Sequence, residues 1–247
     1  MLRLLYQKNA LLDNILVSRI MVVVNLIMSG KTDSIHFIGI GGIGVSALAR
    51  YYASMGIPMT GSDLASSEIT EDLGREGMII TIGRHKKTNI PQNTTRVIYS
   101  PAIPETNLEL KSARARKIFA QSYPEAIGEL TRRYDTITIS GSHGKTTTTA
   151  LTALVLEQGY YDPTVFIGAK IKEFGDTNFR RGRGPYLVLE ADEWNRAFLN
   201  YHPKYAVVTN IDAEHLDTYQ TLAGVEEAFT EYLAKVSARG KIIANAD

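Results

Sequence analysis

The sequence predicts an α/β protein with two consecutive units, each built on a largely parallel sheet, and two observations carry this prediction. Apolar, strand-like runs alternate with helical patterns from Ser34 to the end of the chain, which is typical of parallel α/β structure. Two glycine-rich loops, Gly39–Gly44 and Gly141–Thr147, each stand between a strand and a helix. Such loops present backbone N–H groups to phosphates. The same stretches therefore predict both the fold and a function.

Length and composition agree with a globular protein. The chain has 247 residues, which suits one large domain or two ordinary ones at roughly 100–200 residues each. Hydrophobic residues make up 44% and charged residues 21%, enough for a packed core. The net charge of +1 excludes an overall field that attracts nucleic acid or an anionic membrane. The absence of cysteine excludes disulfides and thiolate chemistry, and we expect a cytoplasmic protein.

Residues 1–33 are predicted to be an N-terminal extension. The apolar run Ile15–Met28 is interrupted by Arg19 and Asn25, and it is shorter than the roughly 20 residues that span a membrane. No small-residue cleavage site follows it, as would follow a signal peptide. We therefore expect no stable membrane insertion. The run is either an extra strand or helix, or translated sequence upstream of a start at Met28.

The first unit is predicted to span residues 34–122. Gly56 and Gly77 each end a helical pattern, as glycine commonly does. The expected strands are Ser34–Ile38, Met59–Gly61, Met78–Ile82, Arg96–Tyr99 and Ile118–Gln121. The expected helices are Val45–Met55, Glu68–Glu76 and Leu108–Arg116. Together with the first glycine loop, this order predicts a Rossmann-like parallel-sheet domain.

The second unit is predicted to span residues 123–247, after a linker at Ser122–Ala126 that contains Pro124. The expected strands are Thr136–Ser140, Tyr186–Glu190, Tyr205–Thr209 and Lys241–Ala244, with helices at Ile127–Tyr134, from the second glycine loop to Gln158, and at Val225–Val236. A strand leading into a glycine loop and then a helix predicts a P-loop ATPase α/β domain. Because the pattern stops at Asp247, we expect this domain to be incomplete.

The first glycine loop, Gly39–Gly44, fits the pattern G-x-G-x-x-G. Glycines there allow a tight turn and a close approach of the backbone to a diphosphate. Asp63 follows about 20 residues later, at the end of the next strand, where an acidic residue meets a ribose. The pattern predicts a ligand with a diphosphate and a ribose, and it does not distinguish NAD from a UDP-sugar. The alternative is a tight turn without a ligand.

The second glycine loop, Gly141–Thr147, reads GSHGKTT. Lys145 is placed to reach the β- and γ-phosphates of a nucleotide, and Thr146 to offer its hydroxyl to Mg²⁺. Only Ser142 and His143 separate its two glycines, whereas the standard P-loop has four intervening residues. The loop therefore predicts ATP and Mg²⁺, and it points away from GTPases and motor ATPases.

Acidic residues gather where two predicted strands of the second unit end. They are Glu190, Asp192 and Glu193 after one strand, and Asp212, Glu214 and Asp217, with Asn210 and His215, after the next. The carboxyl ends of parallel strands line the crevice that binds ligands, and Mg²⁺ prefers oxygen ligands. A single such residue would be read as a solvated charge. Two acid-rich strand ends beside one phosphate loop favour a metal site, with His215 at a second metal or a phosphate.

Six motifs in order resemble the Mur ligase family, the ATP-dependent peptide-bond-forming ligases of bacterial cell-wall synthesis. They are GIGGIGVSALA at Gly39–Ala49, GSDL at Gly61–Leu64, SPAIPETN at Ser100–Asn107, SGSHGKTTTT at Ser140–Thr149, EADE at Glu190–Glu193 and TNIDAEHLDTY at Thr209–Tyr219. The resemblance runs from about Ile35 to the end of the chain. The G-x-H-G-K-T-T loop and the TNI…HLD motif are its most specific parts.

The resemblance implies a mechanism and a set of site residues. The substrates would be UDP-N-acetylmuramate, ATP and L-alanine, joined through an acyl phosphate. The UDP-sugar would lie on Gly39, Gly41, Gly42, Ile43, Gly44, Asp63, His85, Ser100 and Ala102. ATP would lie on Gly141, Ser142, His143, Gly144, Lys145, Thr146 and Thr147. Lys145, Glu190 and His215 would be catalytic, with Thr146 and Glu190 on one Mg²⁺ and His215 at a second metal site.

Two departures keep other functions open. Trp194-Asn195-Arg196 stands where the alanine-adding member carries Ser-Asp, and the member that recycles intact muropeptides has an aromatic residue there. The family also has a further C-terminal domain that helps to bind ATP and the amino acid, so we expect this chain to be a fragment that needs it for ligation. A non-catalytic UDP-sugar or ATP-binding module is a third possibility. A dinucleotide dehydrogenase leaves the second glycine loop unexplained.

Overall fold

The structure is a computed structural model that describes residues 33–245. The predicted apolar run Ile15–Met28 and the alternative start at Met28 lie outside the described residues. Within residues 33–245, none of the helices has the length and apolar character needed to cross a bilayer.

The first sheet is five-stranded and parallel, in the order β3-β2-β1-β4-β5. Its strands are β1 (Ile35–Ile38), β2 (Met59–Asp63), β3 (Ile79–Ile82), β4 (Arg96–Tyr99) and β5 (Phe119–Ser122). Every residue of the central strand β1 is buried, as expected for a parallel strand that is covered on both faces. The carboxyl end of β1 leads directly into the first glycine loop.

The helices of this half are α2 (Ile43–Ala53), α3 (Glu68–Arg75) and α4 (Leu108–Ala115), with a short 3₁₀ turn η1 (Lys87–Asn89). Capping residues fix where two of them start. Ser67 and Thr70 form a capping box at α3, and the Asn107 side chain accepts from the N–H groups of Glu109 and Leu110 at α4. Such caps satisfy N–H groups that have no partner within the helix.

Helix α5 (Tyr123–Thr131) carries the chain from the first sheet to the second. It begins four residues before the predicted Ile127, because Ser122 and Glu125 form a capping box and Pro124 stands in the first turn. Proline is favoured there, since its missing N–H would have no helical partner. The predicted segment Ser122–Ala126 is therefore mostly helix, and the domain boundary near it stays a prediction.

The second sheet has six strands in the order β11-β10-β6-β9-β7-β8. They are β6 (Asp135–Ser140), β7 (Thr164–Ile171), β8 (Thr177–Arg180), β9 (Tyr186–Glu190), β10 (Tyr205–Val208) and β11 (Lys241–Ala244). All neighbours are parallel except β7 and β8, which form an antiparallel pair. The sequence analysis did not predict this β7–β8 hairpin, because Gly168 and Lys170 interrupt the apolar pattern of β7.

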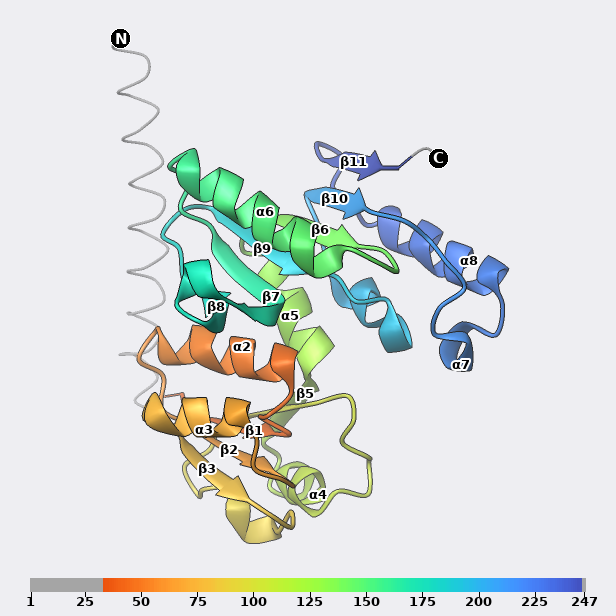
Figure 1. The fold of residues 1–247 in the computed structure, drawn as a ribbon. Coiled ribbons are helices and arrows are strands. Elements are labelled where there is room, and N and C mark those ends of the chain that lie inside the picture. The colour runs from red at the N-terminus through yellow and green to blue at the C-terminus, as the bar shows by residue number, and fades with distance from the viewer. Residues whose placement is uncertain (1–32, 246–247) are drawn as a thin grey trace.

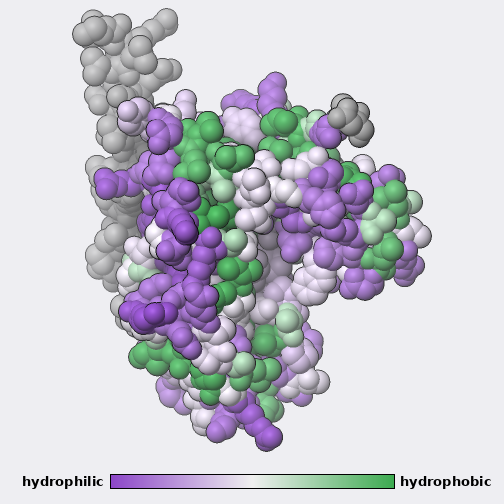
Figure 2. All heavy atoms as spheres, in the orientation of Figure 1, coloured by the Kyte–Doolittle hydropathy of each residue, from purple (hydrophilic) through white to green (hydrophobic). Residues whose placement is uncertain are grey.

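The remaining helices are α6 (Lys145–Gln158), α7 (Leu216–Tyr219) and α8 (Leu222–Leu233), with 3₁₀ turns η2 (Lys172–Phe174) and η3 (Trp194–Asn200). Helix α8 is held by aromatic packing, since the Phe198 ring stacks on Tyr232 at 4.5 Å and meets Phe229 edge-on at 5.2 Å. In Figure 1, α2 lies between the first sheet and the β7–β8 hairpin. Figure 2 shows hydrophobic residues scattered among hydrophilic ones on the face in view. The predicted α/β fold class is confirmed.

Candidate functional site

The second glycine loop connects the end of β6 to the start of α6. Gly141 has a φ of +128° and Gly144 a φ of +80°, and Gly144 caps a helix that begins at Lys145. The last residues of the loop thus form the N-terminus of α6, with its free N–H groups and the positive end of its dipole. That arrangement favours an anion such as a phosphate.

The segment that follows β10 braces this loop. The backbone N–H of His143 donates to the Asn210 side-chain oxygen at 2.8 Å, and Thr209 donates its hydroxyl to the His143 carbonyl at 2.6 Å. The N–H of Ser142 donates to the Asn210 carbonyl at 3.2 Å. Asn210 was predicted at the rim of the site, and in the structure it hydrogen-bonds to the loop. The signal was the position of Asn210 just after a strand that pairs with β6.

Gly141→Ala is expected to abolish nucleotide binding and to lower the melting temperature. A Cβ at Gly141 would lie 2.2 Å from the Thr209 hydroxyl oxygen and 2.8 Å from the Asn210 carbonyl oxygen. The loop or its brace must therefore move, in addition to the strain of a positive φ in a residue with a side chain. Thermal unfolding and titration with Mg-ATP measure both effects.

Gly56→Ala is the matched control. Gly56 has a φ of +74°, and a Cβ there meets no described atom within 4 Å. It therefore carries the strain of a left-handed backbone, about 1–2 kcal/mol, without the steric clash, and nucleotide binding should be retained. Equal effects of the two substitutions would contradict the brace as the cause.

Lys145 folds back over its own loop and pairs with Glu193. Its Nζ donates to the Gly141 carbonyl at 2.6 Å and to the two carboxylate oxygens of Glu193 at 3.1 and 3.0 Å. The Glu193 side chain is only 2% exposed. Glu193 was predicted only as one member of the acidic run beside the phosphate loop, without an assigned partner. The pairing of Glu193 with Lys145 could not be predicted, because it depends on the end of β9 lying beside α6 in the folded protein.

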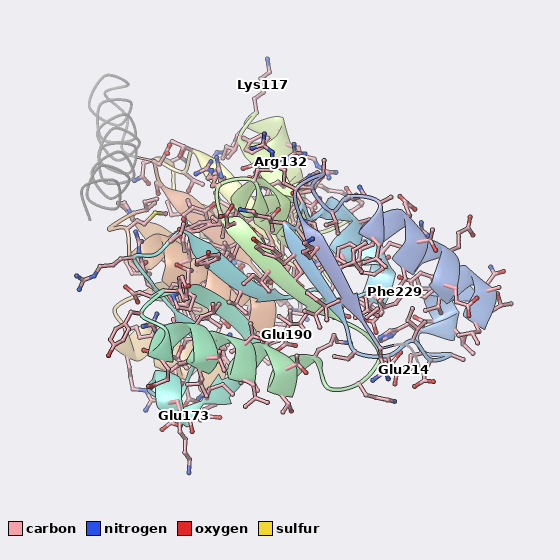
Figure 3. All side chains as sticks on the ribbon, turned by 90° about the horizontal axis from the view of Figure 1, so that it is seen from above. Lys117, Arg132, Glu173, Glu190, Glu214 and Phe229 are labelled. Atoms are coloured by element: carbon pink, nitrogen blue, oxygen red, sulfur yellow. The ribbon has the colours of Figure 1, made fainter. Side chains whose placement is uncertain are left out.

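Glu190 lies on the other side of the loop, at the end of β9. Its carboxylate accepts from the Thr146 hydroxyl at 3.2 Å and from the Gly168 N–H at 2.6 Å. Burial raises the pKa of Glu190, although the hydrogen bonds from Gly168 and Thr146 and the charge of Lys145 oppose that shift. Glu190 lies close to α6 in Figure 3. The two side chains predicted to share a metal, Thr146 and Glu190, are thus in contact.

His215 gathers with a different pair of carboxylates. One ligand atom from each of Asp192, Glu193 and His215 lies within 4.8 Å of the others, and the His215 Nε2 is 3.8 Å from the Glu193 carboxylate. The oxygens of two carboxylates and one imidazole nitrogen suit a divalent cation. Tyr219 steadies this cluster by donating its hydroxyl to the Glu193 carbonyl.

His143 points into a more open part of the site. Its ring nitrogens lie 3.8 Å from Asp212 and 3.6 Å from Glu214, and its side chain is 66% exposed. In Figure 3, Glu214 lies on the side of α7 and α8, away from the hairpin. Asp212 and Glu214, two of the acidic residues after β10, therefore lie near the loop histidine rather than Lys145.

The first glycine loop is fastened to the end of β2. The N–H of Gly41 donates to the Asp63 carboxylate at 2.8 Å, and Gly39 has a φ of +76°. A Cβ at Gly44 would lie 2.7 Å from the Tyr123 hydroxyl. Asp63 therefore holds the loop itself, and Tyr123 from α5 closes against it. The contact of Tyr123 was not predicted, because most of the first sheet lies between Gly44 and Tyr123 in the sequence.

This loop is flanked by two of the other predicted residues, Ser100 and Ala102, and not by His85. The Ser100 Cβ would lie 3.0 Å from a Cβ on Gly39, and the Ser100 hydroxyl accepts from the Ala102 N–H at 3.3 Å. These two residues thus flank the loop from the end of β4. His85 is held elsewhere, with its Nδ1 3.0 Å from the Glu109 carboxylate. Its Nε2 is buried and has no hydrogen-bond partner among the described residues.

Glu109 is the centre of a buried polar cluster that the sequence analysis did not find. It is fully buried. Besides His85, its carboxylate contacts the His36 Nε2 at 3.0 Å, the Ser62 hydroxyl at 2.6 Å and the Asn89 amide at 2.6 Å. Burial alone would raise the pKa of Glu109, but hydrogen bonds from these side chains and from His85 lower it to about 2. A carboxylate with several donors stays ionised in this way.

The chain is thus an α/β protein with two glycine loops, each at a strand-to-helix junction of the kind that favours phosphate, and with acidic residues beside the second loop. Comparison with family models identifies the family of the chain. A model described as "Mur ligase family, catalytic domain" matches residues 34–135, and one described as "Mur ligase middle domain" matches residues 139–247. The chain therefore belongs to the Mur ligase family, and the predicted resemblance is confirmed.

Curated relatives carry a more specific name. The chain is 44% identical over 209 residues to a UDP-N-acetylmuramate–L-alanine ligase of Geotalea daltonii, which covers 85% of the chain and 45% of that relative. It is 43% identical over 220 residues to the ligase of that name from Acidobacterium capsulatum, covering 89% of the chain and 47% of the relative. The chain thus spans less than half the length of these relatives.

Solved structures agree with the fold. The UDP-N-acetylmuramate–alanine ligase of Thermotoga maritima superposes with a TM-score of 0.79 at 31% identity, over 87% of this chain and 49% of that one. A UDP-N-acetylmuramate:L-alanyl-γ-D-glutamyl-meso-diaminopimelate ligase from Neisseria meningitides reaches a TM-score of 0.80 at 23% identity, over 87% and 72% of the two chains. The second likeness is evidence for the fold alone.

Proposed function

We propose that this chain carries the UDP-sugar-binding and ATP-binding parts of a cytoplasmic ligase that joins UDP-N-acetylmuramate to L-alanine in peptidoglycan precursor synthesis. One observation carries the proposal: Lys145 and Thr146, at the start of α6, stand beside Glu190 and the cluster of Asp192, Glu193 and His215. The names of the relatives that are more than 40% identical supply the substrates.

Each half of the chain receives one nucleotide in this proposal. Residues 34–122 hold UDP-N-acetylmuramate, with its diphosphate on the first glycine loop next to Ser100. Residues 123–247 hold ATP on the second loop. Thr146 and Glu190 fit one Mg²⁺, and the atoms of Asp192, Glu193 and His215 fit a second cation. Bound Mg²⁺ would neutralise negative charge on the phosphates.

The chemistry follows from the reactants, because a carboxylate and an amine do not condense unaided. A carboxylate oxygen of UDP-N-acetylmuramate attacks the γ-phosphorus of ATP, ADP leaves, and an acyl phosphate forms. The amine of L-alanine then attacks the carbonyl carbon, inorganic phosphate leaves, and the amine loses a proton. Lys145 stabilises the transferring phosphoryl group. Such transfers depend on positioning and on charge neutralisation more than on covalent catalysis.

A second candidate is the ligase that attaches an intact tripeptide in muropeptide recycling. The observation that favours it is the Trp194-Asn195-Arg196 segment beside the acidic cluster. Asn195 and Arg196 have φ values of 50° and 56°, a left-handed conformation that is strained in residues with side chains and that gathers at functional sites. This segment therefore departs from the alanine-adding pattern in sequence, and it holds two residues in a left-handed conformation.

Calorimetry on the full chain tests the proposal. UDP-N-acetylmuramate is titrated first, then Mg-ATP, with Gly41→Val as the loss-of-binding variant. A Cβ at Gly41 would lie 2.9 Å from an Asp63 carboxylate oxygen, so valine should abolish binding of the UDP-sugar and leave Mg-ATP binding intact. The control Gly74→Ala lies in α3, where a Cβ meets no described atom within 4 Å.

Two outcomes would change the assignment. A folded chain that binds no UDP-N-acetylmuramate would reject the UDP-sugar substrate and leave a nucleotide-binding module. With the C-terminal domain of a relative added, binding of the tripeptide L-alanyl-γ-D-glutamyl-meso-diaminopimelate, but not of L-alanine, in the presence of both nucleotides would favour the recycling ligase.

A further inference from the structure

Asn178, on β8 of the second sheet, is a fully buried polar side chain that reaches across to α2 of the first half. Its amide nitrogen donates to the Ile43 carbonyl and, at 3.0 Å, to the Ser46 hydroxyl. Its amide oxygen accepts from the Arg50 guanidinium. Figure 1 shows the β7–β8 hairpin lying along α2. Both ends of the Asn178 amide are thus occupied by one helix.

These contacts fix the exit of the first glycine loop. Ile43 is the first residue of α2 and belongs to the loop Gly39–Gly44. A buried amide is unfavourable unless its donors and its acceptor are satisfied, so α2 has one preferred position against β8. Tyr123 presses against Gly44 from α5. The loop proposed to hold a UDP-sugar is therefore positioned by residues outside the first sheet as well as by Asp63 of β2.

The other strand of the same hairpin meets the second site. Gly168 of β7 donates its N–H to Glu190 at 2.6 Å, and a Cβ at Gly168 would lie 2.8 Å from that carboxylate. Strands β7 and β8 pair directly, with Phe166 opposite Phe179. One continuous hairpin therefore contacts the first glycine loop through Asn178 and the carboxylate beside the second loop through Gly168.

A second set of contacts at this interface does not touch either loop. Lys170 of β7 pairs with Glu68 and Asp72 of α3, and these contacts are partly exposed. Exposed ion pairs contribute little to stability. Lys170 therefore offers a matched control, since it joins the same hairpin to the same half of the chain without contacting α2.

We propose that Asn178 is a positioning residue that holds the first glycine loop in register with Glu190, and that ligand binding at the two loops is coupled through the β7–β8 hairpin. The identity of the ligands rests on the proposed function. The role follows from the reaction, because a carboxylate on one loop must meet a phosphate on the other. A displacement of about 1 Å between reacting groups slows such a step severely.

Amide hydrogen exchange on the full chain tests the positioning without any ligand. Asn178→Asp keeps the size of the side chain and an oxygen for Arg50, but it sets an oxygen against the Ile43 carbonyl. We expect exchange about tenfold faster at Ser46, whose N–H donates to the Gly42 carbonyl, at the following turn of α2 and at Gly168, with Asn178→Leu showing the same pattern. Lys170→Met should exchange as the unmodified chain does. A folded Asn178→Asp variant with unchanged exchange at α2 would overturn the proposal.

Calorimetry tests the coupling. The Kd of UDP-N-acetylmuramate is measured with and without saturating Mg²⁺ and a non-hydrolysable ATP analogue. We expect the Kd to change about fivefold or more in the unmodified chain and in Lys170→Met, and to be insensitive to the analogue in Asn178→Asp. Equal coupling in all three proteins would overturn the coupling through Asn178. If the unmodified chain binds no UDP-sugar, the proposed function fails, and the exchange experiment still decides the role of Asn178.

Discussion

Lys145→Met is expected to weaken Mg-ATP binding by more than about a hundredfold, because it removes charge-assisted contacts to the β- and γ-phosphates. Binding of UDP-N-acetylmuramate should be unchanged, since within residues 33–245 the Lys145 ammonium donates only to its own loop and to Glu193. Calorimetric titration of each nucleotide separately measures the two effects. Loss of both affinities would indicate a general folding defect instead.

The same substitution is expected to destabilise the fold. Glu193 is 2% exposed and would lose the ammonium that neutralises it. Leaving a buried charge without its partner costs up to about 3–5 kcal/mol. The double variant Lys145→Met with Glu193→Gln removes the uncompensated charge, so urea unfolding should show recovered stability while Mg-ATP binding stays lost. A double variant that binds Mg-ATP would disprove the assigned role of Lys145.

Glu109→Ala is expected to lower the free energy of unfolding by about 3–5 kcal/mol. It would leave donors from His36, His85, Ser62 and Asn89 buried without their shared acceptor. Glu109→Gln keeps one acceptor oxygen and nearly the same volume, so its loss should be smaller. Urea unfolding at neutral pH measures both. A loss below about 1 kcal/mol in Glu109→Ala, the size of an ordinary hydrogen bond, would contradict the central role of this carboxylate.

The contribution of Glu109 should also depend on pH. Its pKa is about 2 in the folded protein, against an ordinary value of 4.5. A carboxyl whose folded pKa is depressed stabilises the protein fully above its unfolded pKa, and this stabilisation is lost as pH falls through the folded value. His36 and His85 are the titratable groups that face it, from β1 and from the loop after β3. The stability difference between the unmodified chain and Glu109→Gln should therefore shrink between about pH 4.5 and about pH 2. A difference that stays constant over this window would contradict the depressed pKa.

Elements with a strong local signal were predicted well from the sequence. The bounds of β4, β9 and β11 agree with the predicted Arg96–Tyr99, Tyr186–Glu190 and Lys241–Ala244. The β7–β8 hairpin was missed, because a glycine, a lysine and a buried asparagine break the alternation that marks a strand. Those residues face other elements, and only the tertiary structure shows their partners.

In the candidate site, too, local motifs were predicted from the sequence and long-range contacts were not. The two glycine loops were predicted because a few adjacent residues are enough to identify each of them. The partners Lys145 and Glu193 are 48 positions apart, and His36 and Glu109 are 73 apart. Glu109 stands in the first turn of a helix, where an acidic residue is ordinarily explained by the helix dipole. Nothing local distinguishes such a residue from the buried centre of a cluster. The roles of the predicted site residues remain predictions.

The Lys145–Glu193 pair has a consequence for which ligands can enter the second loop. Without a ligand, each of these charges neutralises the other in a poorly hydrated place. A phosphate without a metal that pairs with Lys145 would leave the Glu193 carboxylate without a counter-charge. A cation alone that pairs with Glu193 would leave the Lys145 ammonium without one. A magnesium-bound triphosphate carries both charges, so its phosphates can pair with Lys145 while its cation pairs with Glu193. If Lys145 and Glu193 bind as proposed, we expect the second loop to bind magnesium and nucleotide together more tightly than free phosphate.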